Sequence, residues 1–468
     1  MIVVLGAGLS GLTAAYNLRG KTEHPIKVLE REPVHGGASR TVVFGDFRYD
    51  LGGHRFYTKI PHVQQFVESL VGDDLVTVER ISRIYLNGRF INYPLAAFDV
   101  LKALGPLKSA HITLDYALTK MKEAVSPSPD ETFEQWAVKR FGRELYEIYF
   151  RIYSEKLWGV PCAELSSDFA NQRIKGLSFR EAVRDALFKK SDTSTLVRKF
   201  IYPRLGFGMI VDRLIEGWEP PDEVLCSTPV TKILHKGTRI ERIEGSDGAV
   251  AFDARECVNG IAMDDFVRLM DPAPPAEVLR AADDLRYRDM VVLFATFNVP
   301  QITPDHWVYC SDAHCTFSRF HEPKNWSAEM APADKTGLPI EFFCQEGDEI
   351  WTADPEQLFE QSMAQLQSMG LIEHDWAENF DVQRIRKAYP VYTVGYRRPV
   401  ETILGYLRRF ENLHSIGRNA QYKYTSSDIY IDMGIKAAEN ILGHDHELES
   451  IGTDGGYAED GKFRPLSK

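Results

Sequence analysis

The chain has 468 residues, of which 44% are hydrophobic and 26% charged, a composition typical of a globular protein with two or three domains. Its 55 Lys and Arg residues against 67 Asp and Glu residues give a formal net charge of −12, which argues against a nucleic-acid partner. Six cysteines without C-x-x-C spacing, and no apolar run of transmembrane length, indicate a cytoplasmic protein with free thiols, no metal site and no transmembrane segment.

The first predicted elements form a dinucleotide-binding turn. Ile2 to Leu5 predicts a short buried strand. Three glycines follow at the G-x-G-x-x-G spacing of a strand-to-helix turn: Gly6, Gly8 and Gly11. Gly8 lets the backbone approach a pyrophosphate, because it has no Cβ atom, and the following helix offers unpaired N–H groups to the anion. A purely structural glycine turn is the alternative, but the strand and helix context favours a binding site.

The next segments complete this unit. A helix is expected from Thr13 to Arg19 and a second strand from Ile26 to Leu29. Glu30 follows Gly11 by 19 residues, a spacing that suits a carboxylate accepting from a ribose hydroxyl. A second glycine pair, Gly36-Gly37, offers more bare backbone to the same pyrophosphate, although an ordinary loop is the alternative. This continuation resembles the FAD-binding class shared by amine oxidases, phytoene desaturases and sugar-nucleotide mutases.

The chain then passes from strands to helices. The expected elements are a strand over Phe47–Phe56, a helix over Pro61–Val71, a hairpin over Val78–Tyr93 and a helical stretch from Pro94 to about Phe150. Asn87-Gly88 is the hairpin turn, since Asn-Gly is the strongest two-residue turn signal. Gly53 stands beside His54, where a backbone without a Cβ atom can pass close to a flat ring.

The middle of the chain is less regular. Tyr153 to Gly159 is aromatic and charged, neither periodic enough for a core helix nor polar enough for a plain loop. Ser191 to Lys199 indicates a flexible excursion, and Phe200 to Glu216 a glycine-containing loop that enters a helix. Glu223 to Glu244 predicts two or three short strands.

Antiparallel strands and a return to the cofactor site follow. The expected elements are strands over Leu285–Phe297, Trp307–Arg319, Leu338–Gln345 and Arg384–Pro390, a helix over Pro355–Gly370, and a strand, loop and helix over His414–Leu442. The last residues are rich in glycine and charge and indicate a frayed tail.

These elements predict an α/β protein: a Rossmann-like FAD-binding domain with an inserted helical domain and an antiparallel β-sheet substrate domain. The expected boundaries are 1–93, 200–284 and 384–445 for the FAD-binding domain, 94–150 for the helical domain, 151–199 and 285–383 for the substrate domain, and 446–468 for the tail.

Six ordered stretches resemble UDP-galactopyranose mutase and its sugar-nucleotide mutase relatives over most of the chain. They are Gly53-His54-Arg55-Phe56, Arg89-Phe90-Ile91-Asn92-Tyr93-Pro94, Tyr153-Ser154-Glu155-Lys156-Leu157-Trp158-Gly159, Phe317-Ser318-Arg319-Phe320-His321-Glu322-Pro323-Lys324, Tyr389-Pro390, and Gly417-Arg418 with Tyr422-Lys423-Tyr424. Each is weak alone, but their common order makes chance agreement improbable.

The resemblance implies a mutase that interconverts pyranose and furanose forms of a nucleoside-diphosphate sugar without net redox, with N5 of reduced FAD as the nucleophile and a homodimer as a possible assembly. The implied catalytic residues are His54, Arg319 and Arg418. The expected FAD-binding residues are Gly6, Gly8, Gly11, Glu30, Arg31, Gly37, Ala38, Ser39, Gly53, His54, Val230, Gly417, Ser427 and Asp428. The implied substrate-binding residues are Asn92, Tyr153, Trp158, Arg319, Tyr389, Arg418 and Tyr424.

Departures from the family pattern bear on the substrate. A family arginine is replaced by Leu177, so Lys175 or Arg180 would have to supply that phosphate contact. The second family histidine is Tyr57, and one acid expected near the flavin is Ser426. These changes predict a sugar nucleotide other than UDP-galactose, preferably a GDP- or dTDP-linked hexose or deoxyhexose.

Alternatives remain at this stage. A flavin oxidoreductase of the amine oxidase or desaturase type would share the amino-terminal site but would need an apolar tunnel or a carbonyl-polarising lysine instead of a diphosphate clamp. Several of the implied site residues could also serve the fold alone, without binding a ligand. Tyr389 and Tyr424 could be buried tyrosines with satisfied hydroxyls, Arg319 could form a surface salt bridge with Glu322, and Trp158 could be plain core.

Overall fold

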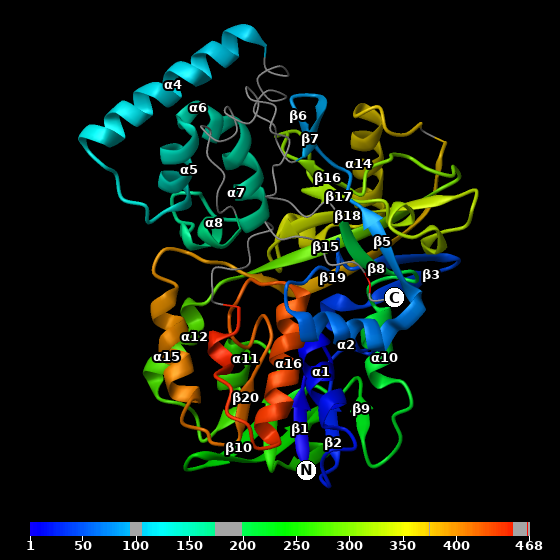
Figure 1. Ribbon diagram of the computed structural model, residues 1–468, viewed down its shortest axis with the longest axis vertical. Coiled ribbons are helices and arrows are strands. Elements are labelled where there is room, and N and C mark those ends of the chain that lie inside the picture. Colours follow the sequence, from blue (N-terminus) through cyan, green and yellow to red (C-terminus); the bar gives the residue numbers. More distant parts are fainter. Residues whose placement is uncertain (94–104, 174–198, 374, 453–465, 467–468) are drawn as a thin grey trace.

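The computed structural model of the protein describes residues 1–93, 105–173, 199–373, 375–452 and 466. A parallel sheet with its helices occupies the lower part of Figure 1, and a helical region and a mixed sheet occupy the upper part. The fold is therefore α/β with parallel and antiparallel sheets, as predicted. None of the helices within these residues is long and apolar enough to cross a membrane. Of the excursion predicted over Ser191–Lys199, only Lys199 is described.

A five-stranded parallel sheet forms the base of the molecule. Its order is β20 (Leu413–Ser415), β13 (Glu256–Asn259), β1 (Ile2–Leu5), β2 (Ile26–Leu29) and β9 (Glu223–Leu225). The helices beside it are α1 (Leu9–Leu18), α2 (Pro61–Val71), α10 (Met209–Ile215) and α16 (Ser427–Ile441). β1 lies at the centre and is fully buried, which explains its unbroken apolar sequence. Strands from both ends of the chain thus meet beside the glycine turn.

A small four-stranded sheet continues this region. Its order is β12 (Val250–Asp253), β11 (Arg239–Gly245), β10 (Val230–Lys236) and β14 (Met270–Asp271). Three further helices, which the sequence pattern did not predict, are α11 (Met263–Arg268), α12 (Ala276–Asp284) and α15 (Arg397–Leu407). They bury short apolar stripes in a hydrophobic core that contains Phe266 and Ile403.

The mixed sheet has seven strands. Its order is β19 (Ala377–Pro390), β15 (Tyr287–Phe297), β18 (Thr336–Cys344), β17 (Arg319–Phe320), β16 (Trp307–Cys310), β6 (Ser82–Leu86) and β7 (Arg89–Tyr93). Only the β16–β6 pair is parallel. β15 and β18 are buried along their whole length, with α13 (Glu349–Thr352) and α14 (Pro355–Ser368) nearby. Asp354 caps α14 and Pro355 begins it, a favourable N-terminal pair.

The helical region confirms the helices predicted before residue 150. It contains α4 (Pro106–Val125), α5 (Phe133–Phe141), α6 (Arg143–Leu145), a π-helical turn (Tyr146–Arg151), α7 (Ile152–Trp158) and α8 (Asp168–Arg173). Thr132 and Gln135 form a reciprocal capping box that starts α5. Residues 94–104, also predicted helical, lie outside the described residues.

The segment predicted to be neither core helix nor loop, Tyr153 to Gly159, is in fact mostly helical, as α7. Non-local contacts explain this. Arg288 donates to the carbonyl oxygens of Lys156 and Leu157, both at 3.2 Å, and so satisfies the end of the helix. The Lys156 ammonium donates to backbone carbonyl oxygens between Cys310 and Phe317, at 2.7–3.4 Å. Lys156, a charged residue that interrupts the apolar pattern, and Arg288 therefore hold this helix against the mixed sheet.

Two small antiparallel sheets join the larger parts. One pairs β3 (Thr41–Phe44) with β4 (Phe47–Asp50), and the other pairs β5 (Leu75–Glu79) with β8 (Lys199–Pro203). The expectation of a loop after residue 200 was wrong for β8, whose partner lies more than a hundred residues earlier.

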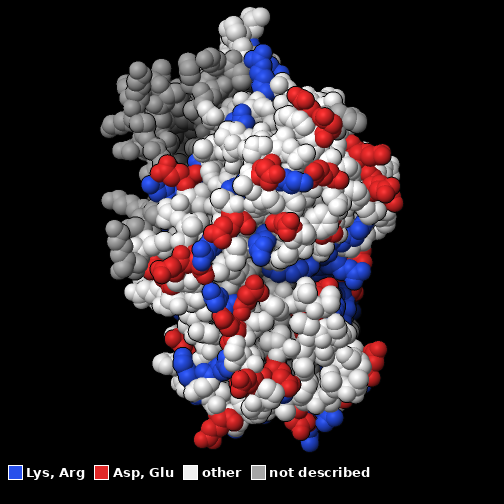
Figure 2. All heavy atoms as spheres, turned by 90° about the vertical axis from the view of Figure 1, so that its right-hand side faces the viewer, with Lys and Arg blue, Asp and Glu red and all other residues white. Residues whose placement is uncertain are grey.

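On the face in Figure 2, acidic and basic side chains are interspersed, apart from a short basic band near mid-height.

Candidate functional site

The glycine turn between β1 and α1 combines a tight fold with open backbone. A Cβ atom at Gly11 would overlap the carbonyl oxygen of Gly6, so this position requires glycine. Gly8 has an extended backbone, with φ −80° and ψ 176°, and a Cβ atom there would meet nothing within 4 Å. Gly36 bridges to Gly8 and donates to the carbonyl oxygen of Ala7 at 2.7 Å. The two glycine stretches therefore lie side by side at the N-terminus of α1.

Glu30 lies at the carboxyl end of β2, beside this turn. Its carboxylate accepts from the backbone N–H groups of Ala7 and Glu32, at 2.8 and 2.9 Å. Thr228, two residues before Val230, donates to the Glu30 carbonyl oxygen at 2.7 Å. The structure thus gathers the following predicted cofactor residues in one region: Gly6, Gly8, Gly11, Glu30, Val230 and the short 3₁₀ turn Gly37–Ser39, which contains Ala38. Arg31 is exposed and pairs with Glu32.

The start of α16 approaches the same helix terminus. A Cβ atom at Gly417 would lie 2.5 Å from Ser10 Oγ, and one at Gly434 would lie 2.6 Å from the Ser10 carbonyl oxygen. These glycines let Arg418 and α16 pack closely on α1. Ser427 begins α16, and Asp428, next to it, is buried. Burial raises the pKa of Asp428, and Ser426 Oγ donates to its carboxylate.

Arg319 is fixed by a carboxylate from the neighbouring strand. Its Nε and Nη2 lie 2.7 and 2.6 Å from Glu341 Oε2, and Nη2 also donates to the Tyr389 hydroxyl at 3.2 Å. Glu341 is fully buried and also accepts from the Gly53 N–H at 3.2 Å. Burial, the largest single effect, would raise the pKa of Glu341, but Arg319 and His321 together outweigh it and lower that pKa to about 2.

The alternative of a surface salt bridge between Arg319 and Glu322 is wrong. Glu322 is fully buried and accepts from the Thr303 N–H at 2.9 Å and from Thr336 Oγ1 at 2.6 Å. Neighbours in sequence therefore separate in space, and Arg319 takes its partner from β18.

Arg418 has a different environment. Nη1 donates to the Ala388 carbonyl oxygen at 2.7 Å and Nε to the Tyr430 hydroxyl at 2.9 Å. Its guanidinium carbon lies 4.8 Å from the centre of the Tyr389 ring. Among the described residues, this partly buried cation forms no ion pair with a carboxylate. A charge held without a counter-ion suits an anionic ligand, since Arg binds phosphate oxygens in a bidentate manner.

The predicted aromatic residues gather around these two arginines. Trp158 and Tyr389 meet Tyr424 edge-to-face, with ring centres 5.3 and 5.0 Å apart. Tyr153 meets Tyr309 at 5.9 Å. Trp158 is only 2% exposed, so its packing is that of a core residue, yet its Nε1 has no hydrogen-bond partner among the described residues. A buried donor of this kind is normally satisfied, which favours a polar ligand nearby.

Asn92 does not join this cluster. It is exposed on β7, between buried Ile91 and partly buried Tyr93. Tyr93 lies 5.3 Å from Tyr309, and alternate residues of a strand face opposite sides, so Asn92 faces away from the tyrosines. Leu177 and the two residues that could replace the family arginine, Lys175 and Arg180, lie outside the described residues.

His54 lies near the two arginines, since the charges of both Arg418 and Arg319 act on its ring. Its ring stacks on Phe207 at 5.2 Å, and Nδ1 lies 3.1 Å from the Gly52 carbonyl oxygen. Burial, and then the positive charge of Arg418, lower the pKa of His54 to about 4. The flat ring that Gly53 admits is the indole of Trp307, which a Cβ atom at Gly53 would overlap.

We expect a pH dependence from His54. Its pKa in the folded protein, about 4, is below the value of about 6.5 in an unfolded chain, so protons bind preferentially to the unfolded state. This histidine therefore lowers the free energy of unfolding as the pH falls from about 6.5 towards 4, and His54→Gln should reduce that loss. Urea unfolding of both proteins across this range measures it. An NMR titration of His54 with a midpoint near 6.5 would contradict the expectation.

Several site residues were missed from the sequence: Trp307, Tyr309, Glu341 and Tyr430. Glu341 carried a usable signal, because it is the one charged residue in an otherwise uncharged predicted strand, and a buried carboxylate needs a partner. The tyrosines carried no comparable signal, since each fits a half-buried strand or helix.

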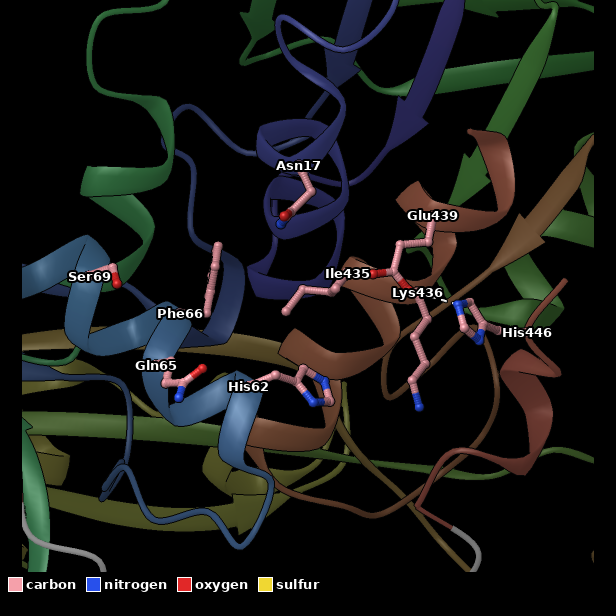
Figure 3. A pocket seen from close by; sticks show the side chains of 9 residues that line it. All are labelled: Asn17, His62, Gln65, Phe66, Ser69, Ile435, Lys436, Glu439 and His446. Carbon is pink, nitrogen blue, oxygen red and sulfur yellow. Dashed lines mark ion pairs between the residues drawn. The ribbon is translucent and has the colours of Figure 1, made fainter. Parts of the chain in front are cut away.

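A separate open pocket lies on the outer side of the parallel sheet's helices (Figure 3). Asn17 of α1, Phe66 of α2 and Ile435 of α16 line it, together with polar residues such as Glu439 and His446, which pair at 2.7 Å. None of the predicted site residues lines it.

Comparison with known proteins identifies relatives. The family described as flavin-containing amine oxidoreductase matches residues 9–442. A protein described as a probable UDP-galactopyranose mutase, from Klebsiella pneumoniae, is 25% identical over 218 residues, which make up 46% of this chain. The match covers 53% of that protein, so the chain aligns with about half the length of this relative.

Solved structures share the fold. A crystal structure of reduced UDP-galactopyranose mutase superposes with a TM-score of 0.85 at 21% identity, covering 98% of this chain and 96% of that one. Putrescine oxidase bound to putrescine superposes with a TM-score of 0.65 at 17% identity, covering 95% and 99%. Since the family match extends over almost the whole chain, the protein belongs to the flavin-containing amine oxidoreductase family.

Proposed function

We propose that the protein is an FAD-dependent mutase that interconverts the pyranose and furanose forms of a nucleoside-diphosphate sugar without net redox. The observation that carries this proposal is Arg418, a partly buried cation with no carboxylate partner in the described part of the chain. It lies beside Arg319 and a group of tyrosines, next to the glycine turn. Fold similarity alone could not choose this activity, because one fold hosts many chemistries.

The residues at the glycine turn fit FAD. The empty space beside Gly8 and the adjacent Gly37 leave room for a pyrophosphate at the N-terminus of α1, and Glu30 lies where a ribose hydroxyl would donate. Val230, Gly417, Ser427 and Asp428 would complete the cofactor site. Reduced FAD supplies a nucleophilic nitrogen, N5, when it is bound.

The side chains of the cluster would bind and orient the sugar nucleotide. Arg418 and Arg319 would hold the diphosphate, and their positive charge would stabilise it as a leaving group. Arg319 is held in place by Glu341 before any ligand arrives, so less side-chain freedom is lost on binding. Tyr389 and Tyr424 would donate to phosphate oxygens without adding charge, and Trp158 and Tyr153 would line the nucleotide side. Neutral His54 would position the flavin or the sugar.

The family match also favours a second candidate, a flavin oxidoreductase of the amine oxidase or desaturase type. Such an enzyme needs an oxidant or reductant in each turnover. A lysine that polarises a carbonyl group is part of that alternative, but Lys156, which lies on α7 with Tyr153 and Trp158, is occupied by backbone carbonyl oxygens.

We predict that the enzyme requires reduced flavin but consumes no stoichiometric reductant or oxygen. The measurement follows oxygen uptake, NAD(P)H oxidation and product formation in parallel. The substrates are a panel of UDP-, GDP- and dTDP-sugars, because a site built for particular hydroxyls rejects analogues strongly. One equivalent of oxygen or NAD(P)H per product would support the oxidoreductase instead. A best rate with UDP-galactopyranose would refute the expected GDP- or dTDP-sugar preference and leave the reaction class standing.

A further inference from the structure

Strand β19 has an irregular backbone close to the residues proposed to bind the diphosphate. It is an edge strand of the mixed sheet, which lies above the parallel sheet in Figure 1. One residue of β15, Asp289, stands opposite three residues of β19, 386–388. The middle one, Lys387, has a φ of 51°, in the left-handed region that residues other than glycine rarely adopt. The strand therefore contains a bulge with a strained residue at its centre.

Both backbone groups of Lys387 are held by side chains. Its N–H donates to Asp289 Oδ1 at 2.6 Å, and its carbonyl oxygen accepts from Asn419 Nδ2 at 2.9 Å. Asp289 is buried, and its second carboxylate oxygen accepts from the Glu346 N–H at 2.7 Å. The acceptor for the Lys387 N–H is thus fixed in place, and the bulge is held from two sides.

The side chain of Lys387 ties the bulge to a helix on the cofactor side of the molecule. Its Nζ lies 2.7 Å from Asp264 Oδ2 and 2.6 Å from Asp265 Oδ1, and both carboxylates belong to the first turn of α11. This helix starts three residues after Gly260, which packs against Gly6 of the glycine turn. The two ion pairs therefore connect the end of β19 to the neighbourhood of the proposed FAD site.

The residue after Lys387 orients Arg418. The carbonyl oxygen of Ala388 accepts from Arg418 Nη1 at 2.7 Å, and the ring centre of Tyr389 lies 4.8 Å from the guanidinium carbon. Two consecutive carbonyl groups, those of Lys387 and Ala388, thus accept from the consecutive residues Asn419 and Arg418. A regular strand directs successive carbonyl groups to opposite sides, so the bulge is what brings both to these two residues.

We propose that Lys387 is a positioning residue for diphosphate binding. The proposal rests on the proposed function, since Arg418 is the residue that it orients. The ion pairs with α11 hold Lys387 in the left-handed conformation, and this conformation keeps the Ala388 carbonyl oxygen where Arg418 donates to it. Neutral acceptors, this carbonyl and the Tyr430 hydroxyl, then fix the guanidinium without neutralising it. Its positive charge stays available for the anion.

Three substitutions separate the backbone conformation from the charge. Lys387→Met removes the ion pairs but keeps a Cβ atom, which disfavours the left-handed conformation by about 5-fold to 30-fold. The Kd for a diphosphate should rise by about the same factor, because the binding conformation becomes a minor one. Lys387→Gly also removes the ion pairs, but glycine adopts this conformation readily, so the Kd should stay within about twofold. Lys387→Arg keeps the charge and should restore binding.

Isothermal titration calorimetry with UDP, GDP and dTDP measures the Kd, and the melting temperature is recorded for each variant. The control is Lys335→Met, which removes an ion pair of 2.6 Å with Glu378 at the opposite end of β19 and should leave the Kd unchanged. A lysine that served stability alone would lower the melting temperature of Lys387→Met and Lys387→Gly without changing the Kd. That result, or an equal loss of binding in both variants, would overturn the proposal.

Crystal structures of Lys387→Met and Lys387→Gly address the same point without a ligand. We expect the hydrogen bond from Arg418 to the Ala388 carbonyl oxygen to be lost in Lys387→Met and kept in Lys387→Gly. Its survival in Lys387→Met would overturn the proposal whatever the calorimetry shows. If the unmodified protein binds none of the three nucleoside diphosphates, the proposed function fails instead, and these crystal structures still decide whether Lys387 positions Arg418.

Discussion

Replacing Gly8 with valine is expected to abolish FAD binding while the apoprotein stays folded. The backbone at Gly8 is extended, a conformation that valine adopts readily, and its side chain would meet no protein atom within 4 Å of the Cβ position. The only thing that valine would displace is a ligand. We expect the purified variant to lack flavin absorbance and to unfold at the same temperature as unmodified protein from which flavin has been removed.

Gly11 gives the matched control, because valine at this position would clash with the protein itself and not with a ligand. A Cβ atom at Gly11 overlaps the Gly6 carbonyl oxygen, so Gly11→Val should destabilise the fold itself. The two variants separate a ligand-binding glycine from a structural one within three positions of the same turn. Stoichiometric FAD in purified Gly8→Val would refute the assignment of this turn as the cofactor site.

Elements set by short-range signals could be predicted from the sequence. The β1–α1 turn depends on three glycines and an adjacent apolar run, and the β6–β7 hairpin depends on Asn87-Gly88 between alternating residues. The helix Pro61–Val71 begins at a proline and is found with the predicted bounds. In each case the physical cause lies within a few residues.

Features that depend on distant partners could not be predicted. β8 is a strand because it pairs with β5, and α7 is a helix because Arg288 and the carbonyl groups after Cys310 hold it. The partner of Arg319 is Glu341 on an adjacent strand, not the sequence neighbour Glu322. The candidate site follows the same rule. Its arginines and tyrosines were recognised from motifs. Glu341, the carboxylate that orients Arg319, was not, because the order of strands in a sheet does not follow from the local sequence.

Arg418→Ala should give the largest loss of activity among the clamp variants that still fold. Each charge-assisted contact contributes about 1.5–3 kcal/mol, so losing one contact to the diphosphate should reduce kcat/KM by about 10-fold to 150-fold. No described carboxylate pairs with Arg418, and Tyr430 keeps its hydrogen bond to the Thr425 carbonyl oxygen, so the substitution leaves no buried unpaired charge. We expect the FAD content and the melting temperature to change little.

Arg319→Ala is a poorer test of diphosphate binding, because it should also destabilise the fold. It would leave Glu341 fully buried without its partner, and breaking a buried pair costs about 3–5 kcal/mol of stability. The double variant Arg319→Met with Glu341→Gln removes both charges and should recover part of that stability without recovering activity. Arg280→Ala, at an exposed arginine on α12, is the control for charge alone. If Arg418→Ala keeps near-normal kinetics on every sugar nucleotide that the unmodified enzyme converts, the diphosphate is bound elsewhere, and the role of Arg418 reduces to its contacts with Ala388 and Tyr430.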